Sequence, residues 1–226
     1  MLDARDAFLG AGWYRPLREA LSAHVAAVEP RKVLDVGCGT GYYLTGVLDA
    51  VPGACALALD ISPAAVGRTV RRGGETRSPV DGLVADVWSP LPIADAAADL
   101  ILNVFAPRNA AEFARVLRTD GVLVVVIPQP SHLRELRAAG LALGLQNDKA
   151  AHLIDGLAVH FRMESRQELS FQMSLTASEI AALVGMGPSA HHHEAGADSP
   201  APGARQSVTA AFEIVSFRKV TVPTQQ

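Results

Sequence analysis

Cysteine is scarce in this sequence. The chain contains only Cys38 and Cys55, and their separation fits no metal-binding or redox motif. Cys38 also lies inside a glycine-rich segment, where a disulfide would distort the local backbone. We therefore expect a protein of a reducing compartment that contains no disulfide.

Long apolar runs and a leader segment are also lacking. No stretch approaches the ~18 consecutive apolar residues that a membrane-spanning helix needs. No charged segment followed by an apolar one opens the chain. The sequence thus predicts a cytoplasmic protein with no membrane partner.

An excess of positive charge is lacking as well. The 20 Lys and Arg residues are outnumbered by 23 Asp and Glu residues, so the formal net charge is −3 at pH 7. Nucleic-acid binding normally draws on clustered Lys and Arg, so the composition gives no electrostatic sign of RNA or DNA binding. One basic cluster is present, formed by Arg68, Arg71, Arg72 and Arg77. On a surface helix such a cluster is more often a solvated face than a phosphate site.

The chain does contain enough apolar residues for one core. With 226 residues, 49% of them hydrophobic, it is expected to form a single domain over residues 1–226. Strand and helix patterns alternate five times, and two further strands are expected at 161–175 and 208–220. This order predicts an α/β fold with a mostly parallel sheet and an antiparallel edge. Residues 1–30 should form a helical cap, and 187–207 a mobile loop.

Helices are expected at 16–28, 42–51, 109–117, 131–143, 149–159 and 177–184. The residues before Pro16 are interpreted as an aromatic-rich segment that leads into the first helix. His191, His192 and His193 could bind a metal, but no partner ligands lie nearby at a defined spacing. We therefore predict no metal site.

Residues 33–41 form an apolar run that ends in glycines at every second position, Gly37, Gly39 and Gly41. A buried parallel strand followed by a tight turn is typical of a nucleotide-binding loop. The dinucleotide fingerprint G-x-G-x-x-G fails here, because its last glycine would fall on Tyr42. Gly-x-Gly-x-Gly after an acidic strand end, Asp35, resembles motif I of the class I S-adenosylmethionine (SAM) methyltransferases. The resemblance implies SAM as cofactor, S-adenosylhomocysteine as product, and contacts from Asp35, Gly37, Cys38, Gly39 and Gly41.

Two further strand ends carry acidic residues. Asp60 follows Gly41 by nineteen residues and ends the second predicted strand, where a carboxylate can accept hydrogen bonds from both ribose hydroxyls. The alternative, a helix cap, suits Ser62 better. Asp86 ends the third strand, 81–85, and could bond the adenine amino group. Ile61 and Val87, the apolar neighbours of these two carboxylates, are placed in the same cofactor site.

The fourth predicted strand begins at Asp99 and exits at Pro107. Because proline cannot continue a central strand, the backbone must turn out over the carboxyl edge of the sheet, where open α/β folds bind ligands. Asn103 and Phe105 are therefore expected to face the reaction centre and position the acceptor, with Asn103 also contacting the cofactor. Trp13 and Tyr14 either pack the first helix onto the sheet or cover the ligand as a lid. As a lid they would join the catalytic set.

A closer resemblance covers nearly the whole chain. It is carried by Arg5-x-x-Phe8-Leu9-x-x-Gly12-x-Tyr14-x-Pro16-Leu17, Asp35-Val36-Gly37-Cys38-Gly39-x-Gly41-Tyr42-Tyr43, Val104-Phe105-Ala106-Pro107-Arg108-Asn109, Pro128-x-Pro130-x-His132-Leu133-x-Glu135-Leu136 and Met186-Gly187-Pro188-Ser189-Ala190. Together these segments resemble the guanine-N1 methyltransferases of 23S ribosomal RNA, a group that includes enzymes protecting macrolide-producing actinomycetes. The resemblance implies a Rossmann-like class I methyltransferase fold with a seven-stranded, mostly parallel sheet and an antiparallel edge hairpin.

Those enzymes carry an amino-terminal Cys/His zinc module that helps to grip RNA, and this chain starts where that module would have ended. Either the chain was trimmed at Met1 or the gene lost its RNA-reading part. The second case favours a small-molecule acceptor, in actinomycete-type specialised metabolism. The alternatives are ribosomal RNA as acceptor and a non-catalytic SAM-binding protein, and a homodimer is left open. In a catalytic version, the reaction is an in-line displacement at the sulfonium methyl group, driven chiefly by alignment of the acceptor.

Overall fold

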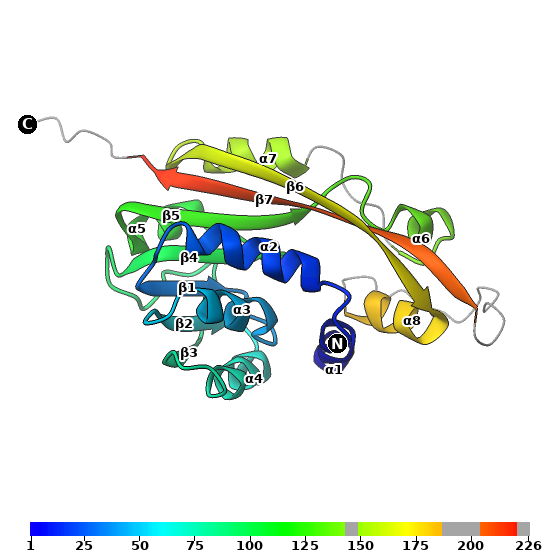
Figure 1. Cartoon of the computed structure of the whole chain (residues 1–226). Coiled ribbons are helices and arrows are strands. Elements are labelled where there is room, and N and C mark those ends of the chain that lie inside the picture. Colours follow the sequence, from blue (N-terminus) through cyan, green and yellow to red (C-terminus); the bar gives the residue numbers. More distant parts are fainter. Residues whose placement is uncertain (143–148, 187–203, 221–226) are drawn as a thin grey trace, which may run out of the picture.

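The computed structural model describes residues 1–142, 149–186 and 204–220 of the chain. Its centre is a seven-stranded sheet in the order β3-β2-β1-β4-β5-β7-β6 (Figure 1). The first five strands are parallel, whereas β7 pairs antiparallel with both β5 and β6. The predicted α/β fold with an antiparallel edge is therefore confirmed. The strands are β1 (Lys32–Val36), β2 (Cys55–Asp60), β3 (Val80–Val84), β4 (Ala98–Val104), β5 (Leu117–Pro128), β6 (Phe161–Thr176) and β7 (Arg205–Lys219).

Side chains that cap helix ends explain where several helices begin. Ser62 accepts a hydrogen bond from the backbone of Ala65 at the start of α4, and Asn109 caps α5 in the same way. Thr176 and Glu179 form a reciprocal capping box at α8. The helices described are α1 (Leu2–Gly10), α2 (Arg15–Ala26), α3 (Tyr42–Ala50), α4 (Pro63–Gly73), α5 (Ala110–Val116), α6 (Arg134–Ala138), α7 (Lys149–Leu157) and α8 (Ala177–Gly185).

The segment that leads into the first helix is itself a helix, α1, and lies within the helical cap expected over residues 1–30. Two sequence expectations need correction. The helix expected over 131–143 is only the five-residue α6, because Leu133 at its start adopts a left-handed φ of 55° that does not continue a helix. Of the loop expected at 187–207, residues 205–207 belong to β7, and 187–203, with the three histidines, lie outside the described residues.

The sheet buries a core on each face, because successive side chains of a strand point to opposite sides. Leu100, Leu102 and Val124 pack against α2 and α3 on one face. Ile101 and Val125 pack against α5 and α7 on the other. Burying a leucine or valine side chain stabilises the fold by roughly 1.5–3 kcal/mol. Both cores leave the carboxyl ends of the parallel strands accessible. In the part of the chain that the structure describes, no helix is long and apolar enough to cross a membrane.

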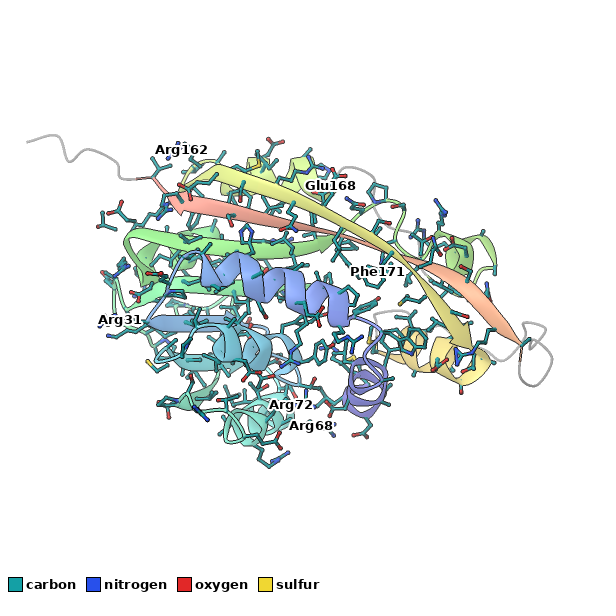
Figure 2. All side chains as sticks on the ribbon, viewed as in Figure 1. Arg31, Arg68, Arg72, Arg162, Glu168 and Phe171 are labelled. Atoms are coloured by element: carbon teal, nitrogen blue, oxygen red, sulfur yellow. The ribbon has the colours of Figure 1, made fainter. Side chains whose placement is uncertain are left out.

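Two arginines of the basic cluster fix α1 against α4. Arg68 pairs with Asp3 at 2.5 Å and with Asp6 at 2.6 Å, and Arg72 pairs with Asp6 at 3.1 Å. Arg72 also donates to the carbonyl oxygen of Thr40 in the glycine loop. Figure 2 shows both arginines on the α4 side of the molecule, facing α1. The interpretation of Arg68 and Arg72 as a solvated face is therefore wrong. They hold α1 over the carboxyl ends of the strands.

Candidate active site

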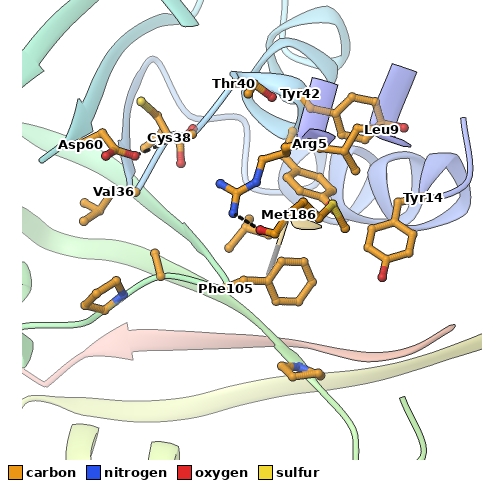
Figure 3. A pocket seen from close by; sticks show the side chains of 18 of the residues that line it. Arg5, Leu9, Tyr14, Val36, Cys38, Thr40, Tyr42, Asp60, Phe105 and Met186 are labelled. Carbon is orange, nitrogen blue, oxygen red and sulfur yellow. Dashed lines mark hydrogen bonds between the residues drawn. The ribbon is translucent and has the colours of Figure 1, made fainter. Parts of the chain in front are cut away.

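A cavity of about 590 Å³ opens at the carboxyl ends of β1, β2 and β4, which is where ligands of open α/β sheets bind (Figure 3). Its walls come from the β1–α3 loop, from the segments that follow β2, β3 and β4, from α1 and α8, and from β7. Of the residues predicted for the cofactor or acceptor, those that line it are Tyr14, Asp35, Gly37, Cys38, Gly39, Asp60, Ile61, Asp86, Val87 and Phe105. Ten of the thirteen predicted residues therefore line one cavity.

The glycine loop has a shape that needs its glycines. Gly37 adopts a φ of 78°, and a Cβ there would lie 2.3 Å from the Cβ of Ala106. Gly39 has a φ of 56° and faces the cavity. Gly41, with a φ of 76°, lies outside the cavity lining, and its close neighbour is Thr69 on α4. Gly41 therefore serves helix packing at the start of α3, whereas Gly37 and Gly39 shape the cavity floor.

Asp60 holds the glycine loop as well as facing the cavity. One carboxylate oxygen accepts the backbone N–H of Gly39 at 3.0 Å, and the other accepts that of Ser62 at 2.9 Å. Each oxygen has lone pairs left for a ligand hydroxyl. Asp86 accepts the backbone N–H of Trp88 at 3.0 Å and is exposed at the rim, where Ile61 is also exposed.

Asp35 is the buried acid of the site. It is 3% exposed, and burial, followed by repulsion from Asp60, raises its pKa to about 7. It forms no ion pair with any residue of the described ranges. Burial and the neighbouring Asp35 carboxylate also raise the pKa of the Cys38 thiol to about 12, so the thiol stays protonated. Asp35 is thus poised to accept a cationic ligand group.

Arg5 is a site residue that the predictions did not include. Its Nη2 donates to the carbonyl oxygen of Met186 at 3.1 Å, and its Nη1 lies 2.9 Å from where a Cβ on Gly39 would be. Figure 3 shows the guanidinium reaching from α1 across the glycine loop toward Met186. The signal for Arg5 was its place at the head of the first motif shared with the guanine-N1 methyltransferases.

Aromatic rings form one wall of the cavity. The ring of Phe212 lies 5.0 Å from that of Tyr14, 5.5 Å from that of Phe105 and 4.7 Å from that of His132, measured between centroids. Tyr43 extends the wall, 6.2 Å from Phe105. Edge and tilted contacts of this kind fix ring orientations. His132 and Phe212 were not predicted, although His132 belongs to one of the shared motifs.

The hydrogen bonds of His132 determine the role of the Tyr14 hydroxyl. Nδ1 of His132 accepts the backbone N–H of Ala211 at 3.2 Å, so the proton of the neutral ring resides on Nε2. Nε2 lies 3.4 Å from the Tyr14 hydroxyl oxygen and donates to it. The Tyr14 O–H can therefore donate to a ligand. Because burial raises the pKa of Tyr14 far above its usual value, the hydroxyl remains a neutral donor.

Besides Gly41, two predicted residues lie outside the cavity lining. Asn103 is fully buried, and its amide donates to the carbonyl oxygens of Val36 at 3.3 Å and Pro107 at 2.9 Å. It ties the end of β1 to the exit of β4, which corrects the expectation that it faces the reaction centre. Trp13 donates from Nε1 to Glu179 on α8 at 3.2 Å and packs against the core. Its position matches the packing alternative rather than a lid.

Two known proteins are similar to this chain over most of its length. A protein of Micromonospora griseorubida, assigned as a 23S rRNA (guanine-N(1)-)-methyltransferase, is 39% identical over 239 residues, which cover 97% of this chain and 80% of that protein. The 23S rRNA (guanine(748)-N(1))-methyltransferase of Streptomyces fradiae is 40% identical over 198 residues, 86% of this chain and 69% of its own length. The chain belongs to the 23S rRNA guanine-N1 methyltransferase family.

Other comparisons concern the methyltransferase domain and its fold. A profile described as a methyltransferase domain matches residues 33–121. The structure of this methyltransferase resembles that of YcgJ from Bacillus subtilis, with a TM-score of 0.62, 17% identity, and 89% and 98% of the two chains covered. It also resembles the N-methyltransferase NodS from Bradyrhizobium japonicum in complex with S-adenosylhomocysteine, with a TM-score of 0.53, 13% identity, and 92% and 89% covered. At these identities the likeness concerns the fold alone.

This SAM-dependent methyltransferase has residues that fit its cofactor. When bound, SAM supplies a methyl group on a positively charged sulfur. Asp60 could accept from the ribose hydroxyls, and Asp86 from the adenine amino group. Buried Asp35 could pair with the ammonium group of the methionine part, and Arg5 with its carboxylate. Within the ranges that the structure describes, no group of three or more His, Cys, Asp or Glu residues is placed to hold a metal ion.

Proposed function

We propose that this methyltransferase transfers the methyl group of SAM to N1 of a guanine base in 23S ribosomal RNA. The observation that carries the proposal is the aromatic wall of Tyr14, Phe105, His132 and Phe212 beside the glycine loop. A planar base turned out of its stack is held by such rings and by contacts at its hydrogen-bonding edge. The reaction in the names of the two extensive relatives supports the same acceptor.

Methylation at N1 requires the guanine base to lose a proton. N1 of guanine carries a proton, which must leave as the N1–CH3 bond forms and the carbon–sulfur bond breaks, with the bonding pair going to sulfur. Loss of this proton to solvent puts negative charge on the neighbouring O6. The Tyr14 hydroxyl, oriented by His132, is the donor we assign to O6, where its hydrogen bond stabilises that charge. Phe105, the exposed ring of the wall, holds the ring plane in line with the methyl group, and buried Phe212 supports Phe105 from behind.

The test is methyl transfer to unmodified 23S rRNA made by transcription, and to hairpins cut from it. We expect label from SAM to appear in 1-methylguanosine at a single guanine, located by the block that N1 methylation imposes on reverse transcription. A chain that binds SAM with normal affinity but labels neither the whole RNA nor its hairpins would refute this acceptor.

A small planar molecule of specialised metabolism is the second candidate acceptor. The contacts that hold α1 over the cavity favour it, because they enclose the site. Arg5 on α1 donates to Met186 at the end of α8, and Arg68 and Arg72 on α4 form ion pairs with α1. The net charge of −3 also provides little attraction for a nucleic acid. The two candidates are separated by incubating the protein and labelled SAM with metabolite extracts of a host strain that lacks the gene. Label in one metabolite and none in RNA selects the small molecule.

A further inference from the structure

A second cavity, of about 420 Å³, lies beside the first. The two share Phe105, Ala106 and Pro128, so the segment that leaves β4 forms the ridge between them. The other walls of the second cavity come from the end of β5, the start of α5 and from α7, with Arg108, Ile127, His152 and Leu157 among the lining residues. A ligand whose body fills the first cavity can therefore reach the second by crossing one ridge.

Arg108 is the charged group of the second cavity. A single guanidinium nitrogen, Nη1, makes its contacts, to Oδ1 of Asn103 and the carbonyl oxygen of Ala106, both at a long 3.4 Å. No carboxylate of the described residues pairs with Arg108. Burial lowers its pKa, which means that desolvation of the cation is not offset by a neighbouring anion.

The burial of Arg108 distinguishes it from the unpaired arginines on the surface. Arg31, Arg71 and Arg77 also lack an ion pair within the described part of the chain, but each is exposed, so water solvates the charge. Arg108 is partly enclosed beside a cavity, where an unpaired cation is costly to keep. Its Nε and Nη2 groups remain available as donors, in the fork geometry that suits a phosphate.

The ridge residue adds an independent observation. Phe105 adopts a left-handed φ of 54° although it is not glycine, a conformation that costs about 1–3 kcal/mol. It is also 44% exposed. Strain of this kind is retained where the surrounding structure enforces it, often at ligand sites. Here it places an aromatic ring in the first cavity while the next residues of the chain carry Arg108 into the second.

We propose that the second cavity binds a phosphate group of the acceptor nucleotide, with Arg108 as its principal ligand. This inference rests on the proposed function, in which the guanine base fills the first cavity. The phosphate and the base would then straddle the Phe105 ridge, so that Arg108 fixes the register of the nucleotide relative to the methyl group. His152 on α7 lines the same cavity and is a second donor to the phosphate.

The first experiment uses small probes and does not depend on RNA methylation. Calorimetry compares guanosine 5′-monophosphate and guanosine 3′-monophosphate with guanosine on the protein saturated with S-adenosylhomocysteine. We expect the wild type to bind one of the two monophosphates at least tenfold more tightly than guanosine, and Arg108→Gln to bind all three probes alike. Arg162→Gln is the matched control, because Arg162 is exposed near the start of β6 (Figure 2), pairs with Arg218 across the strands and lines neither cavity. Equal affinities of the wild type for guanosine and both monophosphates would overturn the proposal.

The second experiment locates the phosphate in RNA. Hairpins carry an uncharged methylphosphonate on the 5′ or the 3′ side of the acceptor guanine, and the dissociation constant is measured for each protein. One of the two substitutions should weaken binding to the wild type about tenfold and leave binding to Arg108→Gln unchanged, since the same contact is then already lost. Inorganic phosphate should compete for the wild type only. Thermal unfolding and SAM affinity of Arg108→Gln, both expected to match the wild type, exclude misfolding.

The outcomes separate the two proposals. If RNA is methylated but neither methylphosphonate changes the affinity, the phosphate site is wrong and the proposed function stands. If RNA is not methylated but guanosine monophosphate is preferred through Arg108, the phosphate site stands and the ribosomal acceptor is wrong. If Arg162→Gln weakens RNA binding as much as Arg108→Gln, the effect is general electrostatics and the site is refuted.

Discussion

The carboxylate of Asp60 accepts the backbone N–H of Gly39 at 3.0 Å. The residue predicted to bind the ribose therefore also sets the position of the loop that must pass beside the cofactor. One side chain at the end of β2 thus couples the shape of the site to its affinity for SAM. Substitution at Asp60 should consequently affect both.

Asp60→Ala should weaken SAM binding by roughly 1.5–3 kcal/mol, about tenfold or more, because hydrogen bonds to a charged group are lost. The loop should also become more mobile, which amide hydrogen exchange at Gly39 would detect. Calorimetry measures the affinity. Asp81→Ala, an exposed carboxylate on neighbouring β3, is the matched control and should bind SAM normally. Unchanged affinity in a folded Asp60→Ala protein would remove Asp60 from the site.

Asp35→Asn should stabilise the cofactor-free protein at pH 8. The folded-state pKa of Asp35 is raised to about 7, so the fold favours the protonated form. Stability from this group is therefore present at low pH and lost as pH rises from about 4 to 7. Asparagine does not titrate, so the advantage of the variant should grow across that range and level off above it, reaching at most roughly 4 kcal/mol. Urea unfolding at pH 5 and pH 8 provides the measurement, and an equal difference at both pH values would contradict it.

The same carboxylate should make SAM affinity depend on pH. An ammonium group pairs with ionised Asp35, so binding to the wild type should strengthen between pH 6 and pH 8. Proton release on binding, seen as a buffer-dependent enthalpy in calorimetry, should occur below pH 7, where Asp35 of the free protein is protonated, and should disappear well above pH 7. Asp35→Asn should bind more weakly and lose most of this dependence. A wild-type affinity that stays flat over this range would show that Asp35 does not contact the ammonium group.

The sequence predicted the framework of the site because that framework is local. The alternation of strands and helices predicts the sheet. One helix and one strand separate Gly41 from Asp60, so both residues lie at the carboxyl edge of the sheet. Asn103 was misplaced for a physical reason. A polar residue at the end of a strand that is covered on both faces can either face the ligand or donate to the adjacent backbone, as Asn103 does. The sequence pattern is identical in the two cases, so it does not distinguish them.

The acceptor wall could not be predicted in this way because its parts come from distant segments. Tyr14 precedes α2, His132 lies between β5 and α6, and Phe212 belongs to β7, and only the antiparallel insertion of β7 beside β5 brings them together. Arg5 was missed for the same reason, since its position depends on ion pairs between α1 and α4. The shared motifs contained Arg5, Tyr14 and His132, but they did not show what each residue contacts.

Gly37→Ala should abolish SAM binding at this loop, because its Cβ would lie 2.3 Å from the Cβ of Ala106 and its φ of 78° strains any other residue. Gly53→Ala separates these causes, since Gly53 has a φ of 89° but no atom within 4 Å of the added Cβ. The Gly53→Ala substitution should lower the free energy of unfolding only through backbone strain, by roughly 1–2 kcal/mol, and should leave the SAM affinity unchanged. The double variant Gly37→Ala with Ala106→Gly should recover part of the affinity. No recovery would mean that the backbone strain, not the contact with Ala106, excludes the cofactor.

Tyr14→Phe isolates the hydroxyl that we assign to guanine O6. The ring contacts with Phe8 and Phe212 are kept, so the fold and the SAM affinity should be unchanged. If the hydroxyl stabilises charge that develops during transfer, kcat should fall by roughly tenfold to several hundredfold while the KM for RNA changes little. His132→Phe provides the second test, because it keeps a ring beside Phe212 but removes the Nε2 donor, which releases the orientation of the hydroxyl and should lower kcat less than Tyr14→Phe does. Combining the two substitutions should cost little more than Tyr14→Phe alone, since His132 acts on the acceptor through Tyr14. Additive losses in single-turnover assays would show instead that His132 contacts the acceptor directly.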